Sequence, residues 1–475
     1  MIAGLRLGIL IEIVKSYKTV LSQLHDTAVP TSIFHGQVKQ AALRGAIFYL
    51  GEVLHHAYVT YQSCVKYAWK ELHGIYYYSV VNGLNSEKEI SSKQEISERL
   101  SIENLYKKIL LLAIAGPCSM RDGETAIVNA DLDKLVHYVD LQPISDEIAA
   151  ESYYIVNICE DAMPCAPYLQ KEGEVDLGWY LITDRLGEKL KRNVVAAEEA
   201  QKELRPSDAL ALRLMKKLRD AWLNQIRSRE IRNPSLDVVD LVCGFNAIYH
   251  VRGGEDICDD NSWGRRLNIQ LSGYGRQTVC SPILENNEIL IEVEPGTLEA
   301  YQVDSRAGFH RQKKNQIVIE GKECVAINRS ESGCCLNWQD SGEGGTHVGE
   351  LVGINHKDST GYATESCFGV IRWLHADQPG SLDIGVELFS GQLEPVILHH
   401  TREGIKWAET IKCFLQYNHS GEAISLIAPP FYVAKDDQVR VESGGENVPV
   451  EITNIIESTD SFIRFKFEPV TAAIL

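Results

Sequence analysis

The short motif Asn328-Arg-Ser-Glu-Ser-Gly333 has residue types and a spacing that could bind a phosphorylated ligand. Asn328 and Ser330 have short side chains that hydrogen-bond in several directions, and Gly333 lets the backbone take a positive φ and approach a ligand closely. A turn of this kind can also aim backbone N–H groups at an anion. The alternative is an ordinary hairpin connection, in which Asn, Ser and Gly are simply turn formers.

The overall charge limits how such a ligand is bound. The 475 residues carry 47 Lys and Arg against 65 Asp and Glu, a formal net charge of -18. General binding to DNA, RNA or acidic membranes needs a basic footprint, so we expect no nucleic-acid partner. No stretch reaches transmembrane length without a charge, so we expect no stable membrane insertion. An anionic ligand must be met by a local cluster of arginines.

The cysteines and the start of the chain indicate where the protein works. The 12 cysteines include no Cys-x-x-Cys pair, so neither a zinc site nor a disulfide framework has the spacing it needs. We expect no metal and no cofactor, with most thiols buried in a reducing compartment. Residues 1–14 resemble a signal peptide superficially, but Glu12 interrupts the apolar run. The expectation is an amphipathic helix docked on a cytoplasmic protein.

Helical periodicity dominates the first half of the chain. Apolar positions recur at helical spacing over 37–78, as one long helix or two in line, and again over 105–115, where Gly-Pro follows. The stretch from 152 to 192 is irregular, with short extended pieces at 153–158 and 179–182. Another helix starts at Pro206 and runs to about residue 225.

After Pro234 the pattern changes to short strands separated by glycine-bearing turns. Many short strands at regular spacing indicate a barrel or a sandwich. We therefore predict an α+β multidomain protein with a mainly helical N-terminal half and a β half. The strand candidates lie at 239–249, 266–271, 288–293, 316–319, 323–327, 349–354, 367–374, 383–388, 412–417, 423–427, 438–441, 448–455 and 461–467.

Several segments of the β half, in this order, resemble the PilZ domain, the bacterial receptor module for cyclic di-GMP. They are the Asn328–Gly333 motif, Gly349-Glu-Leu-Val352, Gly369-Val-Ile-Arg-Trp-Leu374 and Asp383-Ile-Gly-Val-Glu-Leu388, and the similarity covers roughly residues 316–400. Segments 106–116 and 154–164 also look like the N-terminal region of large PilZ-containing proteins. In this pattern we expect Trp373 to fill the core and Arg372 to be an exposed strand partner.

PilZ domains pair this turn with an upstream Arg-x-x-x-Arg segment, because arginine forks bind phosphate bidentately and stack on purine rings. No Arg-x-x-x-Arg lies shortly before the turn here. We favour a cluster at a helix-to-strand junction over the closer pair Arg306 and Arg311. The alternative is that all of these arginines are solvated surface charges. The favoured cluster comprises Arg227, Arg229 and Arg232.

This choice sets the expected domain boundaries. The division is a mainly helical domain at 1–225, a PilZ-like antiparallel β-barrel at 226–400 with a long insertion at about 250–315, and a C-terminal β segment at 401–475 that packs on or extends the barrel. The insertion is unusual, because it separates the arginines from the turn.

The resemblance implies a cyclic di-GMP receptor of bacterial second-messenger signalling. The nucleotide would lie between the arginine segment and the turn, and the helical domain would respond to it. A protein partner in motility, pilus or polysaccharide machinery is implied in the same way. The alternative is a degenerate PilZ protein that acts as an interaction scaffold without nucleotide. No Gly-x-Ser-x-Gly elbow, Walker loop or His-Glu-x-x-His helix occurs, so we expect no enzyme and no catalytic residues. The expected ligand-binding residues are Arg227, Arg229, Arg232, Asn328, Ser330 and Gly333.

Overall fold

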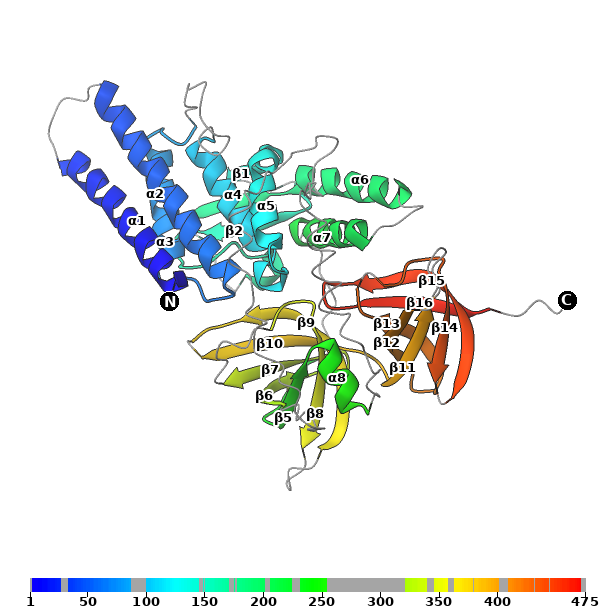
Figure 1. Ribbon diagram of the computed structural model, residues 1–475. Coiled ribbons are helices and arrows are strands. Elements are labelled where there is room, and N and C mark those ends of the chain that lie inside the picture. Colours follow the sequence, from blue (N-terminus) through cyan, green and yellow to red (C-terminus); the bar gives the residue numbers. More distant parts are fainter. Residues whose placement is uncertain are drawn as a thin grey trace.

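The computed structural model has a helical part and two β-barrels that lie side by side (Figure 1). This arrangement confirms the predicted α+β multidomain fold. The structure describes residues 2–26, 33–86, 100–144, 148, 150–170, 175, 177–200, 206–223, 231–253, 321–339, 346–357, 363–378, 380–400, 409–430, 432–443 and 445–470.

The helical part begins with five α-helices, which share one large core (Figure 1). The predicted helix over 37–78 is two helices, because Tyr61 and Tyr67 between them take left-handed φ values of 53° and 68°. The centre of the core is the helix predicted over 105–115, whose N-terminus is capped by the Ser101 side chain. The five helices are α1 (Ile2–Asp26), α2 (Ile33–Val59), α3 (Ala68–Val81), α4 (Ile102–Ile114) and α5 (Glu124–Leu135), with the 3-10 turns η2 (Pro117–Ser119) and η3 (Val136–Tyr138).

A small sheet and two helices complete this part. Strands β1 (Asp140–Pro143), β2 (Tyr153–Asn157) and β3 (Gly178–Ile182) pair in the order β1-β3-β2, which confirms the extended pieces expected there, and η4 (Pro167–Leu169) is a short 3-10 turn. Helices α6 (Asp184–Ala200) and α7 (Pro206–Trp222) follow. Trp222 anchors the end of α7, because its buried indole Nε1 donates a hydrogen bond of 3.1 Å to the carbonyl of Leu111.

The first barrel is an antiparallel sheet in the order β6-β5-β8-β9-β10-β7, closed by pairing of β6 with β7. The short β4 adds to the other side of β6, and α8 (Phe245–Val251) follows β5. Inward residues such as Leu336, Ile371 and Ile384 fill its core. Its strands are β4 (Asn233–Pro234), β5 (Val238–Cys243), β6 (Lys322–Arg329), β7 (Gly333–Gln339), β8 (Leu351–Lys357), β9 (Ala363–His375) and β10 (Ser381–Leu388). Most of the expected insertion, with the strand candidates at 266–271, 288–293 and 316–319, lies outside the described residues.

The second barrel closes on itself in the order β11-β12-β13-β16-β15-β14 and has its own core. The second barrel is a separate closed sheet that begins at Gln392. The expected boundary between the first barrel and the C-terminal β segment was at residue 400. Its strands are β11 (Gln392–His400), β12 (Glu409–Tyr417), β13 (Ala423–Ala428), β14 (Gln438–Ser443), β15 (Glu446–Ser458) and β16 (Ile463–Pro469).

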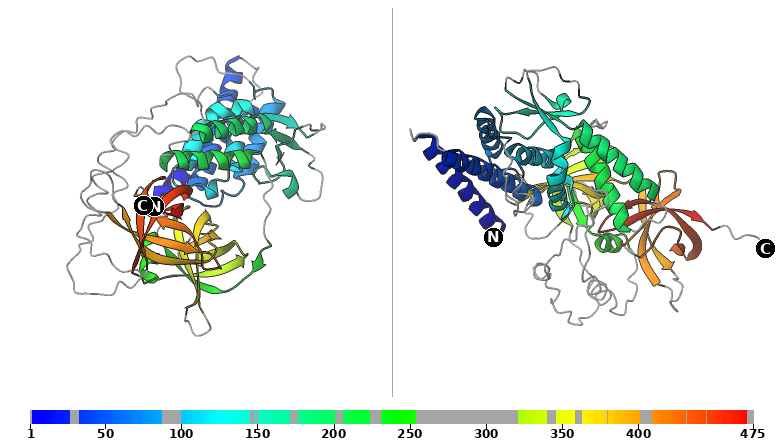
Figure 2. Two further views of the ribbon diagram at one scale, coloured as in Figure 1. Left: turned by 90° about the vertical axis from the view of Figure 1, so that its right-hand side faces the viewer. Right: turned by 90° about the horizontal axis from the view of Figure 1, so that it is seen from above.

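The first barrel lies against both the helical part and the second barrel (Figure 2), and it is joined to them by backbone pairing on one side and by aromatic packing on the other. On the helical side, Ala376 forms a β-bridge with Gln62, in which the Ala376 N–H donates to the Tyr61 carbonyl at 2.7 Å. On the other side, Phe245 and Tyr249 of α8 lie 4.9 and 5.6 Å, ring centre to ring centre, from Phe414 of β12. These contacts fix the first barrel between the other two parts.

None of the described helices combines the length and apolar composition that crossing a bilayer requires. The cysteines among the described residues are free thiols, of which Cys324, Cys335 and Cys413 are buried and Cys159 is exposed.

Candidate functional site

The motif of residues 328–333 forms the tight connection between β6 and β7. The Ser330 N–H donates to the Gly333 carbonyl at 2.7 Å, and the Ser330 hydroxyl donates to the same oxygen at 3.2 Å. From the neighbouring strand, the Leu388 N–H donates to the Ser332 carbonyl at 2.8 Å. The turn is therefore held both by its own hydrogen bonds and by β10.

Gly333 is required here for close approach, not for a positive φ. The expectation of a positive φ was wrong, because Gly333 lies in extended β7 opposite Glu387 and is absent from the glycines with left-handed backbone. A Cβ at this position would lie 2.9 Å from the Val386 carbonyl oxygen, closer than such contacts allow. The glycine lets β7 approach β10 closely behind the turn.

A β-bulge orients the two residues that open the motif. The register of β6 against β7 shifts between Ala326 and Asn328. Arg329 then enters the mouth of the barrel, where its guanidinium contacts His356 at 3.1 Å and the Cys367 thiol at 3.5 Å. Because neighbouring strand residues point to opposite faces, Asn328 lies on the outer face of the barrel. The sequence pattern did not assign this inward role to Arg329.

The arginine segment reaches the turn at its C-terminal end. In the antiparallel pairing of β4 with β6, Asn233 is opposite Arg329 and Pro234 is opposite Asn328. The exposed Arg232 immediately precedes this pair. Its charge acts on Cys335, the partner of Asn328 on β7: burial raises the pKa of the Cys335 thiol to about 11, Asp383 adds to this and Arg232 opposes it. Arg227 and Arg229 lie outside the described residues, as do Arg306 and Arg311.

An aromatic ring lies on the same outer row as the turn. Asn328 pairs with Cys335, Cys335 with Gly385, and Gly385 with Trp373, across β6, β7, β10 and β9. The Trp373 ring covers Gly385 so closely that a Cβ there would lie 1.9 Å from Nε1. The expectation that Trp373 fills the core was therefore wrong, because an irregularity after Gly385 shifts the register and leaves the indole outside.

The outer face of β9 leads from this row to the helical part. Two residues beyond Trp373, the His375 ring contacts the Ser63 hydroxyl at 3.1 Å and the Cys118 thiol at 4.0 Å. Residues two apart on a strand share a face. A ligand over the row would therefore lie close to the loop after α2 and to η2.

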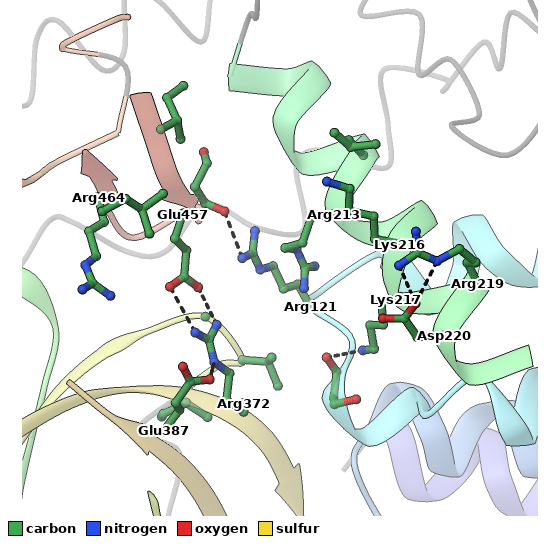
Figure 3. Close-up of a pocket in the computed structure, with 18 of the residues that line it drawn as sticks. Arg121, Arg213, Lys216, Lys217, Arg219, Asp220, Arg372, Glu387, Glu457 and Arg464 are labelled. Atoms are coloured by element: carbon green, nitrogen blue, oxygen red, sulfur yellow. Dashed lines mark hydrogen bonds and ion pairs between the residues drawn. The ribbon is translucent and has the colours of Figure 1, made fainter. Parts of the chain in front are cut away.

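Arg372 contacts the neighbouring strand as expected, but it is half-buried rather than exposed, because it also links the two barrels. Its guanidinium Nε donates to Glu387 of β10 at 2.8 Å, and its two terminal nitrogens donate to Glu457 of β15, one of them at 3.0 Å (Figure 3). These carboxylates hold the pKa of Arg372 above its usual value, although burial alone would lower it. Sequence spacing did not predict this contact, because it joins two separate barrels.

The fold and the site define the class: a closed PilZ-type barrel with the Asn-x-Ser-x-x-Gly turn at its edge, fixed between a helical part and a second barrel. Residues 2–146 match the family described as cyclic-di-GMP receptor FimW, N-terminal domain, and residues 276–395 match the middle PilZ domain of FimW. Together these matches cover more than half of the 475 residues. The chain belongs to the FimW family of PilZ-containing proteins, which confirms the resemblance found in the sequence.

The full-length relative shows the same correspondence along the chain. The cyclic-di-GMP receptor FimW of Pseudomonas aeruginosa is 22% identical over 440 residues, which are 85% of this chain and 68% of that protein. The residues matched by the PilZ family model and the residues that form the first barrel differ at their N-terminal ends. The match begins at residue 276 and so includes Arg306 and Arg311, whereas β4 and β5 of the barrel lie before it, next to Arg232.

Proposed function

We propose that this protein is a cyclic di-GMP receptor that holds the nucleotide between the arginine segment and the turn. The observation that carries the proposal is the pairing of β4 with β6, in which Pro234 is opposite Asn328 and Asn233 is opposite Arg329, so that the exposed Arg232 lies next to the start of the turn. Membership of the FimW family supports the ligand, because the Pseudomonas aeruginosa relative is named as a cyclic-di-GMP receptor. The proposed ligand-binding residues are Arg227, Arg229, Arg232, Asn328, Ser330 and Gly333.

The chemistry of the ligand fits this surface. Cyclic di-GMP has two phosphates, which arginine forks bind bidentately. Its guanine faces can stack on guanidinium groups and on an indole, and stacking of a base on an aromatic side chain contributes about 1–3 kcal/mol. Trp373 offers such a ring on the row that starts at Asn328. Asn328 and Ser330 supply the short polar groups at the other end.

The helical part is proposed to respond through α7. This helix ends at the buried Trp222, and the arginine segment begins a few residues later. A nucleotide that draws the segment onto the turn would bias the position of the end of α7. It can shift this equilibrium only by its difference in affinity for the two arrangements. We further propose that the response is passed to a bacterial protein partner of motility, pilus or polysaccharide machinery. We also propose that the protein is cytoplasmic, needs no cofactor and catalyses no reaction.

Calorimetric titration of the full chain with cyclic di-GMP tests this proposal. Loss of a hydrogen bond to a charged group costs about 1.5–3 kcal/mol, so Arg232→Ala and Ser330→Ala should each weaken binding roughly tenfold or more. The exposed Arg440 on β14 of the second barrel provides the matched control, Arg440→Ala, which should bind as the wild type does.

Two outcomes would change the conclusion. No heat from the wild type at high protein concentration would exclude the receptor and leave the interaction scaffold. Binding that survives Arg229→Ala and Arg232→Ala but is lost in Arg306→Ala or Arg311→Ala would move the arginine site to the segment inside the PilZ match.

A further inference from the structure

A large cavity lies where the helical part meets both barrels (Figure 3). Its volume is about 1050 Å³, and its walls come from η2 and the residues just after it, α6, α7, the residues before β8, β9, β10, β15 and β16. We call it the junction pocket. Seven lysines and arginines line it against four acidic residues, although the whole chain has a net charge of -18. None of the lining residues belongs to the Asn328–Gly333 turn.

The acidic residues of the pocket are already paired with cations. Glu198 pairs with Lys216 at 2.6 Å, and Asp220 pairs with Arg219 at 2.6 Å. Glu387 and Glu457 both bind Arg372, as described above. The remaining cations of the lining are Arg121, Arg213, Lys217 and Arg464.

Arg121 is the most deeply buried of these cations, with only 6% of its surface exposed. Its Nη2 donates to the Ser458 carbonyl at 3.0 Å, but its Nε and Nη1 are buried without a hydrogen-bond partner. Gly349 makes room for the guanidinium, because a Cβ there would lie 3.0 Å from Nε. Burying the donors of a charged group without acceptors costs several kcal/mol, at least about 1–3 for each unsatisfied donor.

Arg213 increases this cost because it has the same charge. Burial and the charge of Arg213 lower the pKa of Arg121 to about 10, although the carboxylates of Glu124, Asp460 and Glu457 oppose this. The terminal nitrogen of Arg213 binds Glu124, but its Nε is also buried without a hydrogen-bond partner. Three donor nitrogens on two neighbouring guanidinium groups thus have no acceptor among the described residues.

Lys217 is the third basic group beside Arg121, and it lies on the same face of α7 as Arg213, four residues later. Its ammonium donates to the Ser119 carbonyl, and it forms no ion pair with a carboxylate in the part of the chain that the structure describes. Burial lowers the pKa of Lys217 to about 7; Glu124 opposes this, and both arginines add to it. Across the pocket, Arg464 donates to the Ser425 hydroxyl at 3.1 Å and lies over the Phe389 ring.

We propose that the junction pocket binds a phosphorylated small molecule, with a phosphate group held by Arg121, Arg213 and Lys217. Arginine forks and a lysine are the groups with which proteins bind phosphate. The phosphate oxygens would accept hydrogen bonds from the three unsatisfied donor nitrogens and would relieve the repulsion between the two arginines. Pockets for small molecules usually have volumes of about 300–1,000 Å³, so there is room for a nucleotide, and Arg464 faces its far end.

Titration of the full chain with inorganic pyrophosphate, ATP and AMP tests the proposal. We expect saturable binding of pyrophosphate and ATP, at least tenfold weaker in Lys217→Met and in Arg213→Gln. The matched control is Arg185→Gln on α6, because Arg185 is exposed and paired with Asp140 only at 3.7 Å. Stronger binding of ATP than of pyrophosphate would assign a nucleotide, whereas equal binding would assign a free phosphate compound.

Several results would overturn the proposal. One is a dissociation constant of the wild type for pyrophosphate above about 1 mM. Another is pyrophosphate binding that stays unchanged in Lys217→Met and in Arg213→Gln. Pyrophosphate binding lost in Ser330→Ala but kept in both pocket variants would assign it to the turn. Hydrogen exchange provides a second measurement, because bound pyrophosphate should protect residues 454–458 and 119–121 in the wild type but not in Lys217→Met. The site proposed for cyclic di-GMP at the turn is tested separately, because it fails if cyclic di-GMP does not bind, whatever the result with pyrophosphate.

Discussion

The two cationic regions of this molecule are built in opposite ways. The turn at Asn328–Gly333 is one continuous piece of chain at the edge of one sheet, and the neighbouring Arg232 of the arginine segment is exposed. The junction pocket takes its cations from Arg121 to Arg464 and brings them together only where three parts of the fold meet. An exposed arginine keeps its hydration, whereas a buried one must find acceptors within the protein or in a ligand.

This difference explains why one region is visible in a sequence and the other is not. A turn with short polar residues and a glycine keeps the same spacing wherever it occurs, so its pattern can be recognised. Arg121 and Arg213 are separated by 92 positions and share no motif. Their proximity depends on how α7 packs beside η2, which no local pattern encodes.

The largest expected effect comes from breaking the ion pair that links the two barrels beside the junction pocket. In Arg372→Met, the carboxylate of Glu457, whose side chain is only 12% exposed, loses its partner. Removing one member of a buried pair is strongly destabilising, so we expect a loss of about 3 kcal/mol in urea unfolding. The exposed pair tested by Arg185→Gln should lose less than about 1 kcal/mol.

A double substitution separates the pair from simple packing. Arg372→Met combined with Glu457→Met should recover most of the lost stability, because it leaves no unpaired charge at that position. If the double variant is as unstable as the single one, the link between the barrels is not electrostatic.

Two glycines allow the regions to be compared by the same change. At the pocket, Gly349→Ala places a Cβ 3.0 Å from the Arg121 Nε on a backbone with φ +97°. A non-glycine residue with such a backbone is strained by about 1–3 kcal/mol. At the turn, Gly333→Ala meets only the Val386 carbonyl at 2.9 Å, without a positive φ. We expect a loss of about 1–2 kcal/mol there.

Ligand titrations should assign each glycine to its own region. Gly349→Ala should weaken pyrophosphate binding and leave cyclic di-GMP binding unchanged, and Gly333→Ala should do the reverse. If both variants weaken both ligands equally, the two regions do not act as separate sites.

The pH dependence of stability distinguishes the buried lysine from the exposed arginines. The pKa of Lys217 is about 7 in the fold, below the ordinary lysine value of 10.5. The unfolded chain therefore binds more protons than the folded one between these values, so the free energy of unfolding rises with pH. Relative to Lys217→Met, the wild type should gain on the order of 1–2 kcal/mol between pH 7 and pH 9. A difference between the two proteins that is independent of pH would contradict the buried lysine.

Much of the fold could be predicted from the sequence, for physical reasons that also mark its limits. The helix at 105–115 and the strands of the first barrel have strong periodicity, and both are present. Helix α6 was missed, because its apolar stripe of Leu186, Leu190 and Val194 is narrow within a charged segment. The outward position of Trp373 could not be predicted, because one register shift exchanges the two faces of a strand.

The smallest effect on stability is expected at the turn itself, in Ser330→Ala. The hydroxyl donates to the Gly333 carbonyl, but the backbone N–H of Ser330 already donates to that oxygen at 2.7 Å. Removing the hydroxyl leaves no buried group unpaired, so the free energy of unfolding should fall by only about 0.5 kcal/mol.

Binding of cyclic di-GMP to Ser330→Ala should nevertheless weaken roughly tenfold, because the hydroxyl is then missing from the surface that binds the ligand. Ser420→Ala is a matched control, since Ser420 is exposed in the connection between β12 and β13 of the second barrel. A large loss of stability with no loss of affinity would make Ser330 a structural residue of the hairpin and would leave the turn without a part in nucleotide binding.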